Sequence, residues 1–154
     1  MSDLFPTINE FGHWTLSPNC PKNIPDNAIG FIYCITNNIS GKKYIGKKLL
    51  QNKKKRKPLK GRINARRYKV ESDWKTYTGS SPVLNDYIVK NGKANFVFEI
   101  ISFQPSKLLL SYYEIKEIID RNAIFRGDYY NEVLNCRFRF RKESSKNITG
   151  AICI

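Results

Sequence analysis

The chain has 154 residues and a formal net charge of +14 at pH 7, and these two values limit what it can be. The length fits a single domain, and a hydrophobic fraction of 41% is enough for a packed core. So large a positive charge favours a polyanionic partner, because lysine and arginine neutralise phosphates and release their counterions. Nucleic acid is the first candidate, and an anionic membrane surface is the second.

Several protein classes are disfavoured by the same sequence. No apolar stretch approaches the roughly 20 residues that span a bilayer, and residues 1–10 carry no basic-then-apolar signal pattern. We therefore expect a soluble, intracellular protein that does not bind membranes. Four cysteines without Cys-x-x-Cys spacing and a single histidine, His13, argue against a zinc site. We expect free thiols and a histidine at the surface.

The first elements in chain order are an arm and a hairpin. Residues 1–28 are rich in Pro, Asn and Ser and predict an irregular N-terminal arm that packs on the core. Residues 29–36 are nearly all apolar or β-branched, as in a strand buried on both faces. Turn residues at 37–41 lead into a second, short strand at 42–46, which completes a β-hairpin.

A basic insertion follows at about residues 47–70. Fourteen Lys or Arg residues and no acidic residue occur between Lys42 and Lys69, and a proline and a glycine disfavour a long helix before about residue 62. Such runs are often solvated or disordered. Here we favour direct contact with a nucleic-acid backbone.

Two helices and a third strand complete the domain. Ser81 before Pro82 predicts an N-cap, and that helix ends at Asn91-Gly92. Residues 96–101 predict a strand, and a second helix runs from residue 105 to about 121. We therefore expect an α+β domain over residues 29–134, a small, mainly antiparallel three-stranded sheet flanked by helices. Residues 135–154 form a polar tail.

Glu114 stands out on the second predicted helix. We expect the core-facing stripe to consist of Leu108, Tyr112, Ile115 and Ile119. Glu114 lies off this stripe, yet its i−4 and i+4 neighbours are apolar, which suggests a partly buried carboxylate. It holds either a metal ion or a basic side chain.

Two tripeptides of the predicted hairpin, Phe31-Ile32-Tyr33 and Tyr44-Ile45-Gly46, resemble the signature of the GIY-YIG nucleases. The later elements follow in that family's order, and the resemblance covers roughly residues 29–134. The stretch from Asp73 to Ser81 is most similar to the homing-type endonucleases of bacteriophages. The chain departs from the pattern at Phe31, where the family usually has glycine.

The resemblance implies a hydrolase that cuts DNA, and it implies a set of catalytic residues. Tyr33 would orient or deprotonate the attacking water, although the alternative is a tyrosine of the core. Tyr44 would share the hydrogen bonds around the phosphate. Glu114 would hold Mg²⁺ or Mn²⁺, and Asn131 would lie near the metal, although it could simply cap a turn. Arg62, Arg66 and Arg67 are the candidates for the arginine that stabilises the transition state, and Arg66 is preferred for its interval to Ser80-Ser81.

The same reading gives the partners and the rival functions. The substrate is expected to be double-stranded DNA, with no obligate protein partner, in the cytoplasm of a bacterial host if a phage encodes the chain. A restriction or repair nuclease, a non-catalytic nucleic-acid-binding protein on the same scaffold and a ribosome-like RNA-binding protein stay open. The residues expected to contact DNA are Lys47, Lys48, Lys53, Lys54, Lys55, Arg56, Arg62, Arg67 and Lys75.

Overall fold

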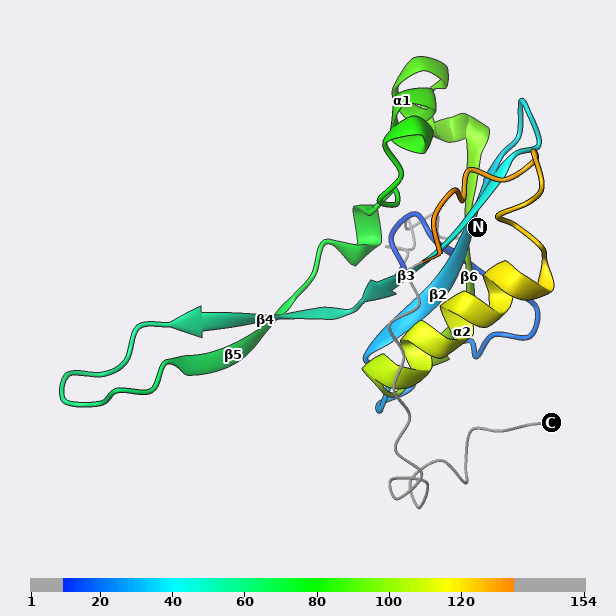
Figure 1. The fold of residues 1–154 in the computed structure, drawn as a ribbon. Helices are drawn as coiled ribbons and strands as arrows, with labels where there is room; N and C mark the ends of the chain where they lie inside the picture. Colours follow the sequence, from blue (N-terminus) through cyan, green and yellow to red (C-terminus); the bar gives the residue numbers. More distant parts are fainter. Residues whose placement is uncertain (1–9, 135–154) are drawn as a thin grey trace, which may run out of the picture.

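The computed structural model describes residues 10–134, which form an α+β domain with a long hairpin projecting from it (Figure 1). The main sheet has four strands in the order β1-β6-β2-β3, and a separate two-stranded sheet forms the hairpin. The strands are β1 (Thr15–Leu16), β2 (Gly30–Asn37), β3 (Lys43–Leu49), β4 (Gln51–Arg56), β5 (Arg66–Glu71) and β6 (Phe96–Gln104), and the helices are α1 (Pro82–Asn91), α2 (Lys107–Asp120) and the short 3-10 turns η1 (Trp74–Thr76) and η2 (Lys93–Asn95).

The central strand is β2, which pairs antiparallel with both β3 and β6. Its sequence is apolar almost throughout, and all of its residues except Thr36 are buried. Because successive side chains point to opposite faces, Phe31, Tyr33 and Ile35 enter one core cluster, and Ile32 and Cys34 enter the other. The continuous apolar run therefore predicts a strand covered on both faces, and the structure confirms it.

The sheet has one strand more than the sequence predicts. The fourth strand, β1, comes from the N-terminal arm and pairs parallel with β6. Next to it, Trp14 is buried in the core, and its indole Nε1 donates a hydrogen bond of 2.5 Å to the Trp74 carbonyl. A strand of two residues leaves no periodicity in a sequence, so only its partner strand and the buried indole define it.

Helix α1 begins at its predicted cap, and α2 begins two residues after the predicted start at residue 105. The Ser81 side chain accepts from the backbone amide of Leu84 to cap α1, and Ser106 accepts from Leu109 to cap α2. Gly92 follows α1 with φ 82, a left-handed conformation that glycine adopts without strain.

The core-facing side of α2 was predicted wrongly. Tyr112 and Ile119, two members of the expected stripe, are exposed, whereas Leu110 and Ile118 are the buried residues of this helix. The helix has apolar residues around much of its circumference, so periodicity alone does not choose the inner face. As a consequence, Glu114 lies on the buried side, midway between Leu110 and Ile118 in sequence.

The basic insertion is an ordered hairpin. Strands β4 and β5 pair antiparallel over six residues each, from Gln51 opposite Glu71 to Arg56 opposite Arg66. At its base, the Ser72 hydroxyl donates to the Leu49 carbonyl at 2.6 Å. The sequence did not predict these two strands, because basic residues occur on both of their faces. Strand prediction relies on alternating apolar and polar residues, and that alternation is absent here. Figure 1 shows the hairpin extending away from the main sheet.

Within residues 10–134, no helix is long and apolar enough to cross a membrane. Cys20 and Cys34 are free thiols in this part of the chain. The remaining two cysteines, Cys136 and Cys153, and the predicted tail at 135–154 lie outside the described residues.

His13 is a packed side chain and not the surface residue that the sequence suggested. Its ring stacks on Phe98 with centroids 4.0 Å apart and lies 4.8 Å from the Trp14 ring. Burial, and then the positive charge of Lys93, lowers the pKa of His13 from 6.5 to about 4. The folded protein therefore holds this imidazole neutral at pH 7.

This packing predicts a pH-dependent stability. Between pH 6.5 and about 4 the unfolded chain binds a proton at His13 that the folded chain does not, so this residue's contribution to stability falls as the pH falls. Thermal melts of the wild type and of His13→Phe should be compared at pH 7 and pH 4.5. We expect the wild type to lose more melting temperature than the variant over this range. Parallel losses would show that His13 titrates alike in both states.

Candidate active site

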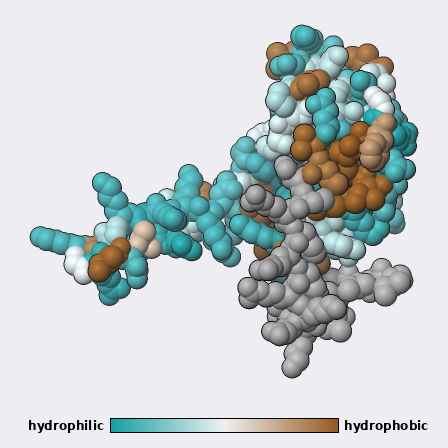
Figure 2. Space-filling view, viewed as in Figure 1, coloured by the Kyte–Doolittle hydropathy of each residue, from teal (hydrophilic) through white to brown (hydrophobic). Residues whose placement is uncertain are grey.

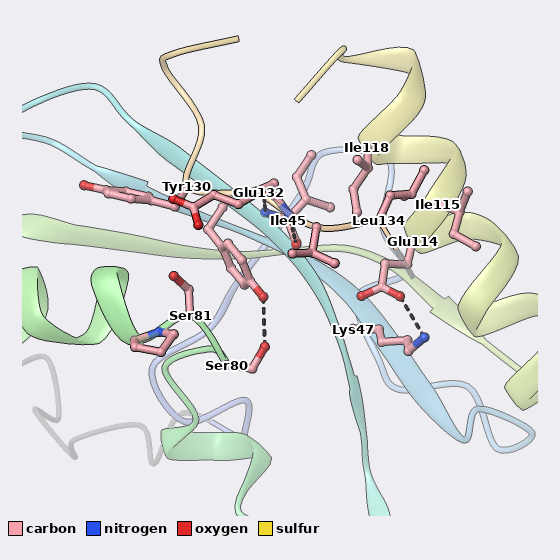
Figure 3. A pocket seen from close by; sticks show the side chains of 14 residues that line it. Ile45, Lys47, Ser80, Ser81, Glu114, Ile115, Ile118, Tyr130, Glu132 and Leu134 are labelled. Carbon is pink, nitrogen blue, oxygen red and sulfur yellow. Dashed lines mark hydrogen bonds and ion pairs between the residues drawn. The ribbon is translucent and has the colours of Figure 1, made fainter. Parts of the chain in front are cut away.

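A pocket of about 370 Å³ opens where β3, the start of α1, the middle of α2 and residues 130–134 meet (Figure 3). Each element contributes side chains with different chemistry, and the apolar ones, such as Ile115 and Ile118, belong to α2. The polar side chains on its wall include Tyr44, Lys47, Ser80, Ser81, Glu114, Asn131 and Glu132.

Tyr33 lies beneath this pocket and not on its wall. It faces Gly46 across the β2–β3 pairing and is only 1% exposed. A Cβ atom at residue 46 would overlap the Tyr33 hydroxyl, so the glycine of the second tripeptide is required for this close approach. The tyrosine ring thus packs under β3 as part of the core.

Ionisation of Tyr33 is disfavoured in the folded chain. Burial, followed by the neighbouring Tyr44 and Tyr77, raises the pKa of Tyr33 well above its usual value of 10.0. A phenol that deprotonates water needs a nearby cation to lower its pKa. It also needs to be accessible to water. The described residues provide neither condition, because the buried central strand places the hydroxyl under Gly46.

Of the two tyrosines in the signature tripeptides, Tyr44 is the one on the pocket wall. Its hydroxyl lies 2.9 Å from the Ser80 hydroxyl oxygen, and its ring centroid lies 6.2 Å from that of Tyr33. Burial raises the pKa of Tyr44, and the hydrogen bond with Ser80 partly opposes this. At neutral pH the side chain is therefore a phenol that can both donate and accept a hydrogen bond.

Glu114 and Lys47 form an ion pair on the pocket wall. The Lys47 Nζ lies 2.7 Å from the Glu114 carboxylate and donates a second bond of 3.1 Å to the Ser111 hydroxyl. Both side chains are partly exposed to the pocket, as Figure 3 shows. The pairing anticipated as the alternative to a metal is present, and the carboxylate remains accessible.

Asn131 is fully engaged with the backbone of β3. Its Oδ1 accepts from the Ile45 amide at 2.9 Å, and its Nδ2 donates to the Ile45 carbonyl at 2.8 Å. These bonds replace those that a neighbouring strand would make, and they fix the backbone of β3 at Ile45, next to Tyr44 and Gly46. The geometry therefore supports a positioning role for Asn131 in place of contact with a metal.

Arg66 does not reach the pocket. It lies in β5 opposite Arg56, at the end of the strand pairing far from the main sheet. Among the described residues of the pocket wall there is no arginine, and Lys47 supplies the cation. Arg66 was preferred for its interval to Ser80-Ser81. That interval does not indicate proximity here, because β5 belongs to a hairpin that extends away from the main sheet.

Glu132 is a site residue that the sequence analysis missed. It lies on the pocket wall directly after Asn131, so the pocket has two carboxylates, one from α2 and one from the C-terminal segment. No group of three or more His, Cys, Asp or Glu side chains occurs within residues 10–134. Carboxylate oxygens are ligands that Mg²⁺ prefers, and this ion commonly takes only one or two of them.

The residues expected to bind DNA divide into two groups. Lys48 is only 16% exposed, because it pairs with Asp73 at 2.6 Å and lies 3.6 Å over the Tyr77 ring. These contacts leave little of its side chain accessible for the expected contact with DNA. Lys75 pairs with Glu71 at 3.4 Å and stays accessible. The exposed residues of the hairpin and its tip are Lys53, Lys54, Lys55, Arg56, Arg62 and Arg67.

Two paired strands that carry Tyr33 and Tyr44, next to a helix that presents Glu114, define the GIY-YIG nuclease class. A family model described as "Putative endonuclease segE, GIY-YIG domain" matches residues 14–134. The chain belongs to this GIY-YIG family. The match includes Trp14 and β1, which complete the sheet. Neither the curated proteins nor the solved structures include a match to the chain.

The different environments of the two tyrosines predict different effects of losing each hydroxyl. Tyr44→Phe should reduce cleavage by about a hundredfold or more, as when a group that handles the nucleophile is lost. Tyr33→Phe should reduce it less and should mainly lower the melting temperature, because a buried hydroxyl is removed. Cleavage rates at saturating DNA and thermal melts of both variants test this. A larger loss of rate for Tyr33→Phe with an unchanged melting temperature would assign the activation of the attacking water to Tyr33.

Proposed function

We propose that the protein is a metal-dependent endonuclease of the homing type that uses Mg²⁺ or Mn²⁺ to hydrolyse phosphodiester bonds in double-stranded DNA. One observation carries the proposal. A single pocket contains two carboxylates, two phenols and an ammonium group, from Glu114, Glu132, Tyr44, Tyr130 and Lys47. Phosphodiester hydrolysis needs such groups, because it must hold a cation, orient water and neutralise developing charge.

The donor set of the pocket fits a hard divalent cation. Glu114 would hold it through its carboxylate oxygens, Glu132 adds a second carboxylate to the pocket wall, and the pocket is open enough to admit water and a phosphate. When bound, such an ion supplies Lewis-acid stabilisation of the phosphate and a more acidic bound water. The structure offers no cluster of soft ligands in the described residues that would favour another metal.

The chain's own residues have separable tasks in this proposal. Tyr44, held by Ser80, orients the attacking water through its hydroxyl. Lys47, whose ammonium is already positioned by Ser111, stabilises negative charge as it builds on the phosphate. Tyr33 positions β3 by packing against Gly46, and Asn131 positions it through hydrogen bonds to the Ile45 backbone. The net charge of +14 draws DNA toward the domain.

A non-catalytic nucleic-acid-binding protein is the second candidate. The Lys47–Glu114 ion pair favours it, because a carboxylate that is satisfied by lysine needs no metal. A restriction or repair role on the same chemistry is a third candidate. Cleavage of a supercoiled plasmid with and without Mg²⁺ separates the first two candidates, and mapping of cuts on genomic DNA separates the roles of an active enzyme.

Glu114→Gln tests the metal site most directly. Glutamine preserves the size and helix propensity of the side chain but removes the charge that a divalent cation requires. We expect a normal fold, loss of nearly all Mg²⁺-dependent plasmid cleavage, and DNA binding in EDTA that is retained or tighter. Full cleavage by this variant would exclude Glu114 as a ligand. Loss of folding together with binding would identify the ion pair as structural.

Lys47→Met and Arg66→Met test which cation acts in the reaction. Lys47 lines the pocket and Arg66 does not, so only Lys47→Met should lower the rate at saturating DNA, by roughly a hundredfold as for a lost transition-state donor. Arg66→Met should weaken DNA binding and leave that rate nearly unchanged. Arg67→Met, from the neighbouring position of β5, is the matched control for Arg66. The reverse order of rates would place Arg66 at the phosphate.

A further inference from the structure

The β4–β5 hairpin (Gln51–Glu71) carries a density of positive charge that the domain itself does not neutralise. Its strands contain Lys53 opposite Lys69, Lys55 opposite Arg67, and Arg56 opposite Arg66. Like charges in directly opposed positions destabilise a strand pair. A two-stranded ribbon without an apolar face is also marginal by itself. An external polyanion would therefore stabilise the paired form of this hairpin.

Charge is distributed over both faces of the hairpin. Residues that pair directly share a face, so Lys53, Lys55, Arg67 and Lys69 form one cationic surface. The opposite face presents Lys54, Arg56 and Arg66 around Tyr68. Figure 2 shows this projection covered in hydrophilic residues along its length. A ribbon that is cationic on both sides fits a groove with phosphates along each edge better than it fits a flat surface.

Duplex DNA fits this surface better than a single strand. Binding of single strands relies on exposed aromatic rings on which the bases stack. Within the paired strands, Tyr68 is the aromatic residue, and Arg56 covers its ring at 4.5 Å. Six residues at about 3.3 Å each give a reach of about 20 Å, which corresponds to roughly six base pairs at 3.4 Å.

The tip of the hairpin carries two exposed apolar side chains among its basic residues, whereas the exposed side chains of the strands are mostly basic. Ile63 is 97% exposed and Leu59 is half exposed, and Figure 2 shows hydrophobic residues at this end of the projection. Proteins that bend DNA place basic residues along the minor groove and insert an apolar side chain between base pairs. The hairpin combines the same two features in the same order along its length.

We infer that the β4–β5 hairpin is a DNA-bending arm, which lies along the minor groove of duplex DNA and wedges Ile63 and Leu59 between base pairs. This rests on the proposed DNA substrate. Because β4 follows β3 after a single residue and β3 carries Lys47 into the pocket, the arm engages DNA that continues from the cleavage site. The bend gives the enzyme a preference for deformable sequences without direct reading of bases.

The bend is measured with the full chain in EDTA, so that no DNA is cut. The probe is a duplex of about 30 base pairs, far shorter than the persistence length of DNA, with a fluorescent donor and acceptor at its ends. We expect the wild type to increase energy transfer. The tip variant, Leu59→Ser with Ile63→Ser, should abolish this increase and weaken binding by about tenfold. Its dependence on salt should not change, because the basic strands are intact.

Two further variants make the result specific. Val89→Ser removes another apolar side chain, 84% exposed on α1, and should bend DNA like the wild type. Changing Lys53, Lys55, Arg67 and Lys69 to glutamine should lower the log-log salt slope by about 3 to 4 units. Ile63→Ser alone serves if the double variant does not fold.

Four outcomes would overturn the inference. These are normal bending by the tip variant, an unchanged salt slope after neutralisation, binding of the single strand or of an RNA duplex as tightly as the DNA duplex, and a tip variant that changes the oligomeric state of the free protein. None of these measurements depends on cleavage. A failure of the metal proposal, seen as full activity of Glu114→Gln, is therefore recognised separately.

Discussion

The pair of hydrogen bonds between the Asn131 side chain and the Ile45 backbone is the interaction on which the candidate site depends. It joins β3, which carries Tyr44 and Lys47, to the segment that carries Glu132. Both bonds are buried, so removing the amide would leave the Ile45 amide and carbonyl without partners at a cost of about 1–3 kcal/mol each. A second buried bond, from Asn37 to the Tyr130 hydroxyl, supports the same segment.

The Glu114 carboxylate lies close to the apolar core and is stabilised there by an ion pair. Glu114 lies on the inner side of α2 between buried Leu110 and Ile118, where an unpaired carboxylate would be costly. Lys47 compensates it, and the pocket keeps both groups in contact with solvent. The same pair therefore stabilises the resting protein and keeps available the two groups that the proposed reaction requires.

The main sheet and the projecting hairpin are stabilised in different ways. The four-stranded sheet is fixed by apolar packing on two faces, with Trp14, Phe31 and Phe98 in close contact. The hairpin has no such packing and opposes like charges across its strands. An element that contributes little to the core can change its charge and its tip without unfolding the domain.

The sequence by itself determined the features that depend on neighbouring residues. The apolar run of β2, the turn before β3, the serine caps of α1 and α2, and the two tripeptides that name the family are all local, and the structure confirms these elements. The expected site around Tyr33, Tyr44, Arg66, Glu114 and Asn131 came from the resemblance to the GIY-YIG nucleases, and local pattern added only that Glu114 is partly buried.

Only the tertiary structure decided which groups meet. Asn131 and Ile45 are 86 positions apart, and Lys47 and Ser111 are 64 apart, so no periodicity could pair them. Tertiary packing also chose the inner face of α2, placed Tyr33 under Gly46, added Glu132 to the pocket and carried Arg66 away from it. The physical reason is that helix capping, turn formation and apolar periodicity act between neighbouring residues, whereas burial, charge pairing and side-chain hydrogen bonds such as Asn131 to Ile45 depend on contacts between distant segments.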